Sequence, residues 1–177
     1  MDCDGICAAN EVFTVMNNNL FVILSIIVYM ISLGLTCYST LGPDGAVKAG
    51  EEGFLLLILG WLGLVLGVIP GLPWLGNVFL LFTWITYLAN TYKLSTICGI
   101  LALFFASTFL LMDSILVVIG SDVRSAKIAS YEVGYWVWLI SISSILIPSV
   151  VFFYKNKPVL EEQKSMDKQK NKEAVSQ

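Results

Sequence analysis

Histidine is absent from this chain of 177 residues, and charged side chains are scarce. The missing histidine removes the commonest general base and the commonest zinc ligand of proteins. Only 13% of the residues are charged and the net charge is −3, which excludes a nucleic-acid-binding protein. No apolar segment holds paired carboxylates, and no nucleophile elbow, phosphate loop or dinucleotide fingerprint occurs. The sequence therefore predicts a non-enzymatic protein without catalytic, cofactor-binding or metal-binding residues.

Apolar residues, in contrast, make up 57% of the chain, and the mean hydropathy is +0.81. Soluble domains are about 45–50% apolar and about 25% charged. Long apolar runs can satisfy their backbone groups within lipid only as helices. The composition therefore predicts an all-α integral membrane protein, a polytopic bundle of transmembrane helices with the lipid bilayer as its first partner.

Five apolar segments are predicted to be helices, because polar breaks or prolines separate them. They are Leu20–Thr40, Phe54–Ile69, Trp74–Asn90, Leu94–Ile119 and Tyr135–Tyr154. Pro148 predicts a kink in the last one. In an alternative arrangement, Phe54–Pro73 is re-entrant or lies along the interface, which leaves four spanning helices.

Two polar segments are predicted to be loops between these helices. The first, LGPDGAVKAGEEG, is expected to turn at Pro43-Asp44-Gly45, and the second is GSDVRSAKIASYEVG. We expect residues 1–19 to be an extracytoplasmic segment, residues 20–154 to be the transmembrane domain, and residues 155–177 to be a polar, lysine-rich cytoplasmic tail that is helical at most briefly.

The basic residues predict how the chain is oriented, because cytoplasmic loops carry an excess of Lys and Arg. With five crossings, Lys48, Lys93 and six tail lysines lie inside and Arg124 and Lys127 lie outside, a count of eight against two. With four crossings, Lys48 moves outside and the count is seven against three. Both arrangements place the C-terminus in the cytoplasm, and we favour five crossings.

Asp113 is the one acidic residue inside a predicted apolar helix. An ionisable group at membrane depth costs about 2.5–3.5 kcal/mol and often marks an ion or proton path. However, Asp113 is only roughly 9 Å from the predicted helix end at Ile119, at about 1.5 Å per residue. We therefore favour a structural role, in which it faces the headgroups or pairs with Arg124 or Lys127, and keep a functional intramembrane acid as the alternative.

Pro70, Gly71 and Pro73 interrupt the longest apolar stretch and are a candidate broken-helix element. Discontinuous helices of this kind form the substrate sites of many transporters. Together with Asp113, they support an alternative function, a small transporter or channel built by oligomerisation.

Small residues recur at helical spacing on two predicted helices and indicate close helix packing. The two sets are Gly60, Gly63 and Gly67, and Gly99, Ala102 and Ala106. Packing within one chain is the favoured explanation, and a homodimer seam or a narrow pore is the alternative. The expected protein partner is a second copy of the chain or another membrane protein.

Cysteines and aromatic residues suggest no separate site. Cys3 and Cys7 have neither redox nor zinc spacing, and whether they form a disulfide stays open. Cys37 and Cys98 are expected to be small buried hydrophobes. Several tryptophans and tyrosines are expected to form a membrane-interface belt: Trp61, Trp74, Trp84, Tyr131, Tyr135, Trp136 and Trp138. Asn77 and Asn90 are expected to cap helices or bridge loops.

Three segments run in a familiar order: Gly60-Trp61-Leu62-Gly63, Trp74-Leu75-Gly76-Asn77 and Gly134-Tyr135-Trp136-Val137-Trp138-Leu139. Over roughly residues 50–150, the chain resembles a loosely defined set of small, uncharacterised bacterial integral membrane proteins. The chain departs from them at Gly76 and Val78, where Ala and Pro are usual, and at Lys93, where a basic cluster is usual. The resemblance implies a multi-pass protein of the bacterial cytoplasmic membrane and carries no activity.

These observations favour a non-enzymatic accessory or interaction subunit in the membrane, with the oligomeric transporter or channel as the alternative. A membrane enzyme that acts on lipid through Asp113 and loop residues such as Asp122 or Glu132 is the least favoured hypothesis.

Overall fold

The computed structural model describes the backbone of residues 19–42, 45–65, 69–119 and 122–175. This part of the chain is mostly helical. Its α-helices are Asn19–Leu33, which we call the N-terminal helix, α2 (Gly53–Val65), α3 (Leu75–Leu88), α4 (Tyr92–Ser107) and α5 (Val133–Val175). Two 3₁₀ helices are η1 (Ile69–Trp74) and η2 (Thr108–Leu111). The strands are β1 (Tyr38–Leu41), β2 (Val47–Ala49), β3 (Ser114–Ile119) and β4 (Asp122–Tyr131).

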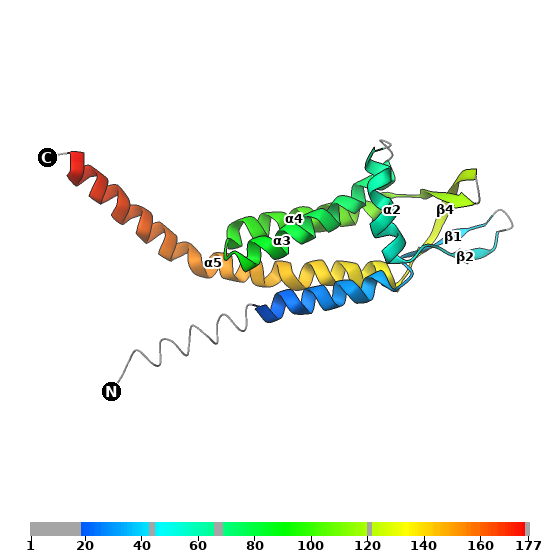
Figure 1. Cartoon of the computed structure of the whole chain (residues 1–177), viewed down its shortest axis with the longest axis horizontal. Coiled ribbons are helices and arrows are strands. Elements are labelled where there is room, and N and C mark those ends of the chain that lie inside the picture. Colours follow the sequence, from blue (N-terminus) through cyan, green and yellow to red (C-terminus); the bar gives the residue numbers. More distant parts are fainter. Residues whose placement is uncertain (1–18, 43–44, 66–68, 120–121, 176–177) are drawn as a thin grey trace, which may run out of the picture.

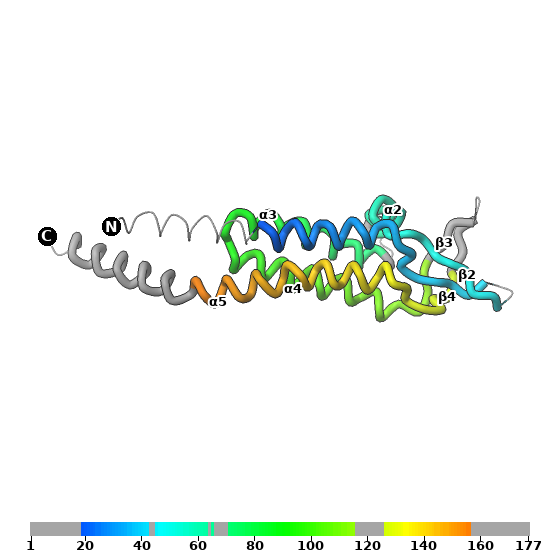
Figure 2. Tube along the Cα trace, turned by 90° about the horizontal axis from the view of Figure 1, so that it is seen from below, coloured from blue at the N-terminus to red at the C-terminus, as the bar shows by residue number. Residues whose placement is uncertain are grey.

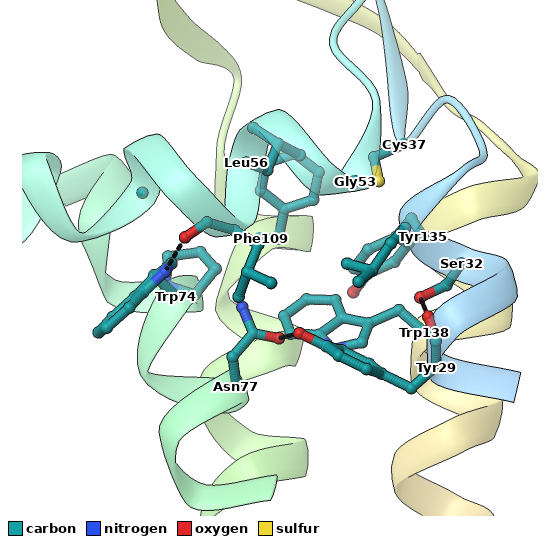
Figure 3. A pocket seen from close by; sticks show the side chains of 14 residues that line it. Tyr29, Ser32, Cys37, Gly53, Leu56, Trp74, Asn77, Phe109, Tyr135 and Trp138 are labelled. Carbon is teal, nitrogen blue, oxygen red and sulfur yellow. Dashed lines mark hydrogen bonds between the residues drawn. The ribbon is translucent and has the colours of Figure 1, made fainter. Parts of the chain in front are cut away.

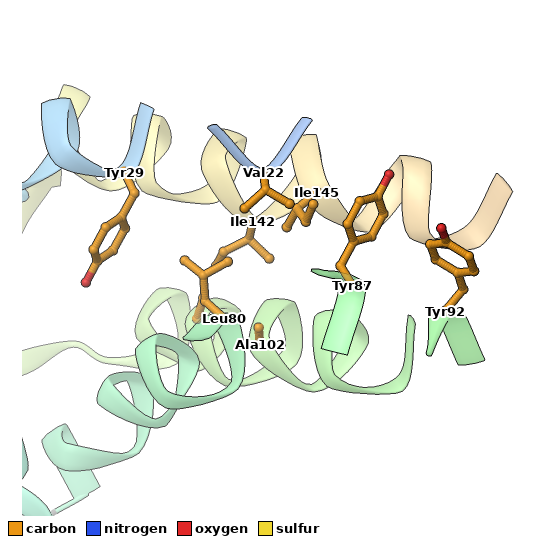
Figure 4. Close-up of a cluster of buried hydrophobic side chains, with 9 residues drawn as sticks. Val22, Tyr29, Leu80, Tyr87, Tyr92, Ala102, Ile142 and Ile145 are labelled. Carbon is orange, nitrogen blue, oxygen red and sulfur yellow. The ribbon is translucent and has the colours of Figure 1, made fainter. Parts of the chain in front are cut away.

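The N-terminal helix, α3, α4 and α5 lie side by side along the long axis of the molecule and form the bundle (Figures 1 and 2). Its interior is packed with side chains such as Leu80, Ala102, Ile142 and Ile145, which are at most 1% exposed (Figure 4). The helices pack against one another through these buried residues, because residues three and four positions apart in the sequence lie on the same face of a helix.

One antiparallel sheet lies at one end of the bundle (Figure 1). We call it the end sheet, and its strand order is β2-β1-β4-β3 in the described part of the chain. Two hairpins build it, one from each half of the chain, and they join where β1 pairs with β4. At this junction, Ser39 is opposite Ser130, and their hydroxyl oxygens are 2.7 Å apart.

The end sheet corrects four sequence predictions, and all-α is only an approximate class. The first predicted loop contains β2, and Pro43 and Asp44 of its predicted turn lie outside the described residues. The predicted helix Leu20–Thr40 ends at Leu33, and its last residues form β1. The predicted helix Leu94–Ile119 ends as α4 and η2 by Leu111, and SILVVI forms β3. Most of the second predicted loop is β4. The physical reason is that Ile, Val, Thr and Tyr favour an extended backbone wherever a partner strand is available.

The helix α2 lies across the sheet end of the bundle, whereas the bundle helices run along it (Figure 1). Gly53 is buried, while Phe54, Leu59 and Val65 are exposed. At 13 residues, α2 is shorter than the roughly 20 residues that a membrane crossing needs. The predicted helix over Phe54–Ile69 therefore exists, but its length and direction agree with the interfacial alternative.

The C-terminal helix α5 is longer than predicted. It begins at Val133 and its backbone stays helical to Val175, so Pro148 lies within it and most of the expected polar tail continues the helix. Among the described residues, three helical stretches are long and apolar enough to cross a membrane: Gly71–Leu88, Tyr92–Leu111 and Val133–Asn156. The N-terminal helix is apolar but shorter.

The bundle places apolar side chains outside and hydroxyl groups inside. Ile27 and Ile85 are among many large apolar residues on its outer faces, whereas Ser25, Thr83 and Ser95 are fully buried. A soluble protein rarely exposes apolar surface on this scale. This arrangement and the three apolar helices indicate a protein that associates with a membrane.

Candidate functional site

The main candidate site is a cavity of about 90 Å³ at the sheet end of the bundle. The N-terminal helix, α2, η1, α3 and α5 converge on it, and α2 covers one side (Figure 3). Its walls are mostly apolar and include five aromatic residues, Tyr29, Trp74, Phe109, Tyr135 and Trp138. The cavity is therefore an apolar space in which any polar group has a strong influence on what binds.

Most polar groups around the cavity are already paired. The Tyr29 hydroxyl donates to Asn77 Oδ1 at 3.2 Å, and this bond connects the N-terminal helix to α3. Trp74 Nε1 donates to the carbonyl of Leu57 at 2.8 Å and ties η1 to α2. Tyr135 donates to the carbonyl of Ala106 at 3.2 Å. These bonds hold the aromatic walls in place.

Trp138 differs from these neighbours, because its indole Nε1 is buried and has no hydrogen-bond partner in the described part of the chain. Its ring lies beside the Tyr29–Asn77 pair (Figure 3). With Oδ1 of Asn77 accepting from Tyr29, the amide nitrogen Nδ2 is the part of Asn77 that remains as a donor. The indole N–H of Trp138 is therefore a buried donor without an acceptor in the described part of the chain.

Gly60 and Gly76 allow two elements to approach these indoles closely. A Cβ atom on Gly60 would lie 2.5 Å from Trp74 Cδ1, and one on Gly76 would lie 3.1 Å from Trp138 Cζ2. Gly60, predicted from its spacing to be a packing residue, therefore contacts the wall of the cavity. Gly63 is half-buried on α2, and Gly67 lies outside the described residues.

The second predicted set of small residues makes contacts within the chain. A Cβ on Gly99 would lie 2.8 Å from Leu146 Cδ1 on α5, and Ala102 and Ala106 are fully buried in the bundle. Gly76 of α3 faces the backbone of both alanines, because its added Cβ would be 3.2 Å from Ala102 O and from Ala106 N. Close packing of α4 against its neighbours accounts for this set.

The predicted broken-helix element is the 3₁₀ helix η1, which contains Pro70, Gly71 and Pro73. It connects α2 to α3 at the sheet end of the bundle, and Pro73 lines the cavity. The segment η1 therefore turns the chain from α2, which lies across the bundle, into α3, which runs along it.

Asp113 lies between η2 and β3 and is exposed, so the prediction that it belongs to an apolar helix is wrong. Its backbone carbonyl accepts a hydrogen bond from Ile128 N at 3.0 Å, and the next residue, Ser114, is opposite Lys127. Burial is the main cause that raises the pKa of the Tyr131 hydroxyl, and the negative charge of Asp113 raises it further. Asp113 thus stands at the base of the end sheet. Its pairing with Arg124 or Lys127 stays a prediction, because the side chain of Arg124 lies outside the described part of the chain.

Two sets of buried hydroxyl groups connect the bundle helices, and neither was predicted from the sequence. Ser25 donates to the carbonyl of Ser141 at 2.8 Å and accepts from Trp84 Nε1 at 3.0 Å. Ser95 contacts both the carbonyl of Thr83 and the hydroxyl of Ser149. A signal was available in α5, where Ser141, Ile142, Ile145 and Ser149 follow one helical face.

The remaining predictions have mixed outcomes. Cys37 and Cys98 are free and buried, as expected, whereas Cys3 and Cys7 lie outside the described residues. Trp61 and Trp136 are exposed, as a belt requires, but Trp84 bonds inside the bundle and Trp74, Tyr135 and Trp138 line the cavity.

The two asparagines also differ. Asn90 has a φ of 58° just after α3 and accepts from the Tyr92 hydroxyl at 2.8 Å, so it bridges the turn between α3 and α4 as predicted. Asn77 instead bridges two helices. Among the described residues, no group of three or more Cys, Asp or Glu side chains is arranged to hold a metal ion.

Comparisons with known protein families, with curated proteins and with solved structures find no match to this chain. The geometry of the bundle, the end sheet and the cavity therefore carries the functional argument.

Proposed function

We propose that the chain is a non-enzymatic accessory subunit of a bacterial cytoplasmic membrane, which binds a partner protein through its end sheet. The observation that carries this proposal is the end sheet itself, because two distant hairpins are combined into one platform beyond the apolar bundle. The resemblance to small bacterial membrane proteins supports the choice of membrane.

The pairing of β1 with β4 supports four crossings over the five that we favoured from the sequence. With five crossings, residues 41–53 lie in the cytoplasm and residues 120–134 lie outside, so the hairpins that contain β1 and β4 would be on opposite sides of the membrane. Instead, Ser39 pairs with Ser130 in one sheet. With four crossings, both hairpins lie outside and both ends of the chain are cytoplasmic, with α2 along the outer interface.

The outer edge of the end sheet suits a protein partner. β2 is an edge strand with only three residues, and all three are exposed. Val47 on this strand is 65% exposed and Leu41 on β1 is 41% exposed. Unpaired strand edges with apolar side chains are common sites for the addition of a strand from another chain.

The transporter alternative has lost one of its two sequence arguments, because Asp113 lies at the base of the end sheet and not within a helix. The proline break is present as η1, where it joins α2 to α3 at the sheet end of the bundle. We therefore keep one function.

Site-specific photocrosslinking in native membranes tests the proposal. A photoreactive amino acid is introduced in place of Val47, and the matched control carries it in place of Ile147, which is 64% exposed on the outer face of α5. We expect one discrete protein adduct from Val47, which survives purification in mild detergent, and none from Ile147. The absence of any adduct at Val47, combined with a monomeric chain in mild detergent, would overturn the proposal.

A further inference from the structure

The cavity has little to offer a polar ligand, because most polar side chains that line it bond to the protein itself. Tyr29, Trp74 and Tyr135 each donate to another protein group. Ser32 donates to the carbonyl of Tyr29 at 2.6 Å, and Trp138 Nε1 has almost no accessible surface. The described side chains that line the cavity include no Asp, Glu, Lys or Arg. A polar or charged molecule would lose its hydration here without gaining partners, so the matching ligand is apolar.

The walls of the cavity belong to the apolar part of the bundle. Trp74 and Asn77 lie in the apolar stretch Gly71–Leu88, and Trp138 lies in the stretch Val133–Asn156. Both stretches are long and apolar enough to cross a membrane. When the chain is in its membrane, hydrocarbon and not water therefore surrounds these walls.

The apolar wall continues onto the outer surface of the protein. The cavity is partly open, and its lining includes the half-buried side chains of Leu33 on the N-terminal helix and Leu57 on α2. Met30 lies one helical turn before Leu33, Ile58 follows Leu57, and both are exposed. An apolar chain can therefore enter from the side of the bundle without crossing a polar rim.

The volume of the cavity limits how much of a ligand it can hold. It measures about 90 Å³, whereas an apolar cavity of about 150 Å³ in another protein stays dry and binds benzene. The space therefore suits a short stretch of hydrocarbon chain and excludes a glycerol group with its headgroup.

We infer that this cavity binds the acyl chain of a membrane phospholipid. A few methylenes of the chain lie against Tyr29, Phe109 and Leu56 (Figure 3), and the rest of the lipid stays outside. A free fatty acid is a poorer match, because no charged side chain lines the cavity to hold its carboxylate. The inference rests on membrane association and not on a protein partner, so its failure would leave the partner function of the end sheet untouched.

Photolabelling from within the lipid tests the inference. The purified full chain is placed in vesicles of phosphatidylcholine, a small share of which carries a diazirine in the first half of one acyl chain. Illumination joins the chain to the nearest side chain, and mass spectrometry locates the adducts. Tyr29 and Phe109, which are 9% and 8% exposed, report on the cavity, and Ile85, which is 53% exposed, reports on the outer surface.

We expect adducts at Tyr29 or Phe109 in addition to those at Ile85. Leu56→Trp fills the cavity from α2 and should lower the yield at Tyr29 and Phe109 about tenfold, which is the effect of about two methylenes that lose their contacts. The matched control is Leu55→Trp, because Leu55 is the neighbouring residue on α2, is 39% exposed and does not line the cavity. This control should keep the full yield.

Two results would overturn the inference. One is labelling of Ile85 without any adduct at Tyr29 or Phe109, and the other is a yield at these two residues that Leu56→Trp leaves unchanged. If Leu56→Trp does not fold, Ser32→Leu fills the same cavity from the N-terminal helix and is held to the same expectation. Unchanged labelling of Ile85 confirms that each variant keeps its place in the membrane.

Discussion

The Ser95 and Ser149 hydroxyl oxygens are 2.9 Å apart inside the bundle and connect the first turn of α4 to α5. Either hydroxyl can be the donor in this contact, because each carries one proton and Ser149 also has the carbonyl of Ile145 within 2.7 Å. Ser95 also lies 3.1 Å from the carbonyl of Thr83 on α3. One hydroxyl group therefore contacts two neighbouring helices.

Ser95→Ala should destabilise the bundle more than Ser149→Ala does. A hydrogen bond between membrane helices contributes about 0.6 kcal/mol, so we expect losses of about 1 and about 0.6 kcal/mol, with a double variant that is less than additive. Unfolding in mixed micelles measures both. Ser143→Ala is the control, since Ser143 bonds only to Leu139 of its own helix, and an equal loss there would contradict the prediction.

Tyr87→Phe should keep or increase stability, because the Tyr87 hydroxyl is buried without a partner in the described residues. Its ring contacts with Tyr92 and Phe152 are retained in the variant. Tyr29→Phe should instead lose about 1 kcal/mol, since its hydroxyl donates to Asn77. Thermal unfolding of the two variants side by side checks the contrast, and a clear loss in Tyr87→Phe would show an acceptor that the hydroxyl needs.

Gly134→Ala should destabilise the contact between the start of α5 and the segment that leads into β1. The added Cβ would lie 2.7 Å from the carbonyl oxygens of Leu35 and Thr36, which are backbone atoms and cannot turn aside. We expect a loss of about 1–3 kcal/mol, typical of overpacking. Gly34→Ala is the control, because its nearest atom is 3.8 Å away. Similar unfolding temperatures for both variants would show that the start of α5 can shift.

Cysteine labelling in intact cells should place Val47 on the opposite side of the membrane from Asn19 and Lys155. Single cysteines at these exposed positions are introduced after Cys3 and Cys7 are replaced by serine. An impermeant maleimide should modify Val47→Cys directly, and the other two only after permeabilisation. Direct labelling of Asn19→Cys with protection of Val47→Cys would restore the five-crossing arrangement.

Cys37 should be unreactive in the folded protein, since burial raises the pKa of its thiol to about 11. Near neutral pH, its thiolate fraction is roughly 100-fold below that of a free cysteine. The unfolded thiol ionises first, so the stability that the buried thiol contributes is complete below about pH 8.5 and is lost as the pH rises towards 11. Alkylation rates in native and denaturing detergent measure the difference, and equal rates would refute it.

The sequence was sufficient to predict helices at all five apolar segments, because an apolar run of that length has few other solutions. The residues at which these helices end could not be predicted. SILVVI follows the apolar run of α4 and η2 with only one charged residue, Asp113, in between, and the presence of β4 beside it makes it a strand. The cavity could not be predicted, because its walls come from elements that are far apart in the sequence. Whether Trp138 Nε1 finds a hydrogen-bond partner likewise depends on where α3 and the N-terminal helix place their side chains.

The pairing of Ser39 with Ser130 also determines when the end sheet can form during synthesis. These residues are 91 positions apart, so β1 emerges long before its partner strand β4 exists. At the usual rate of translation, the ribosome needs about 5–20 s to reach β4. During that interval, the first hairpin has an open edge that another strand can occupy. The end sheet therefore cannot be complete before β4 has been synthesised, and nascent chains stalled between the two hairpins should be its most vulnerable state.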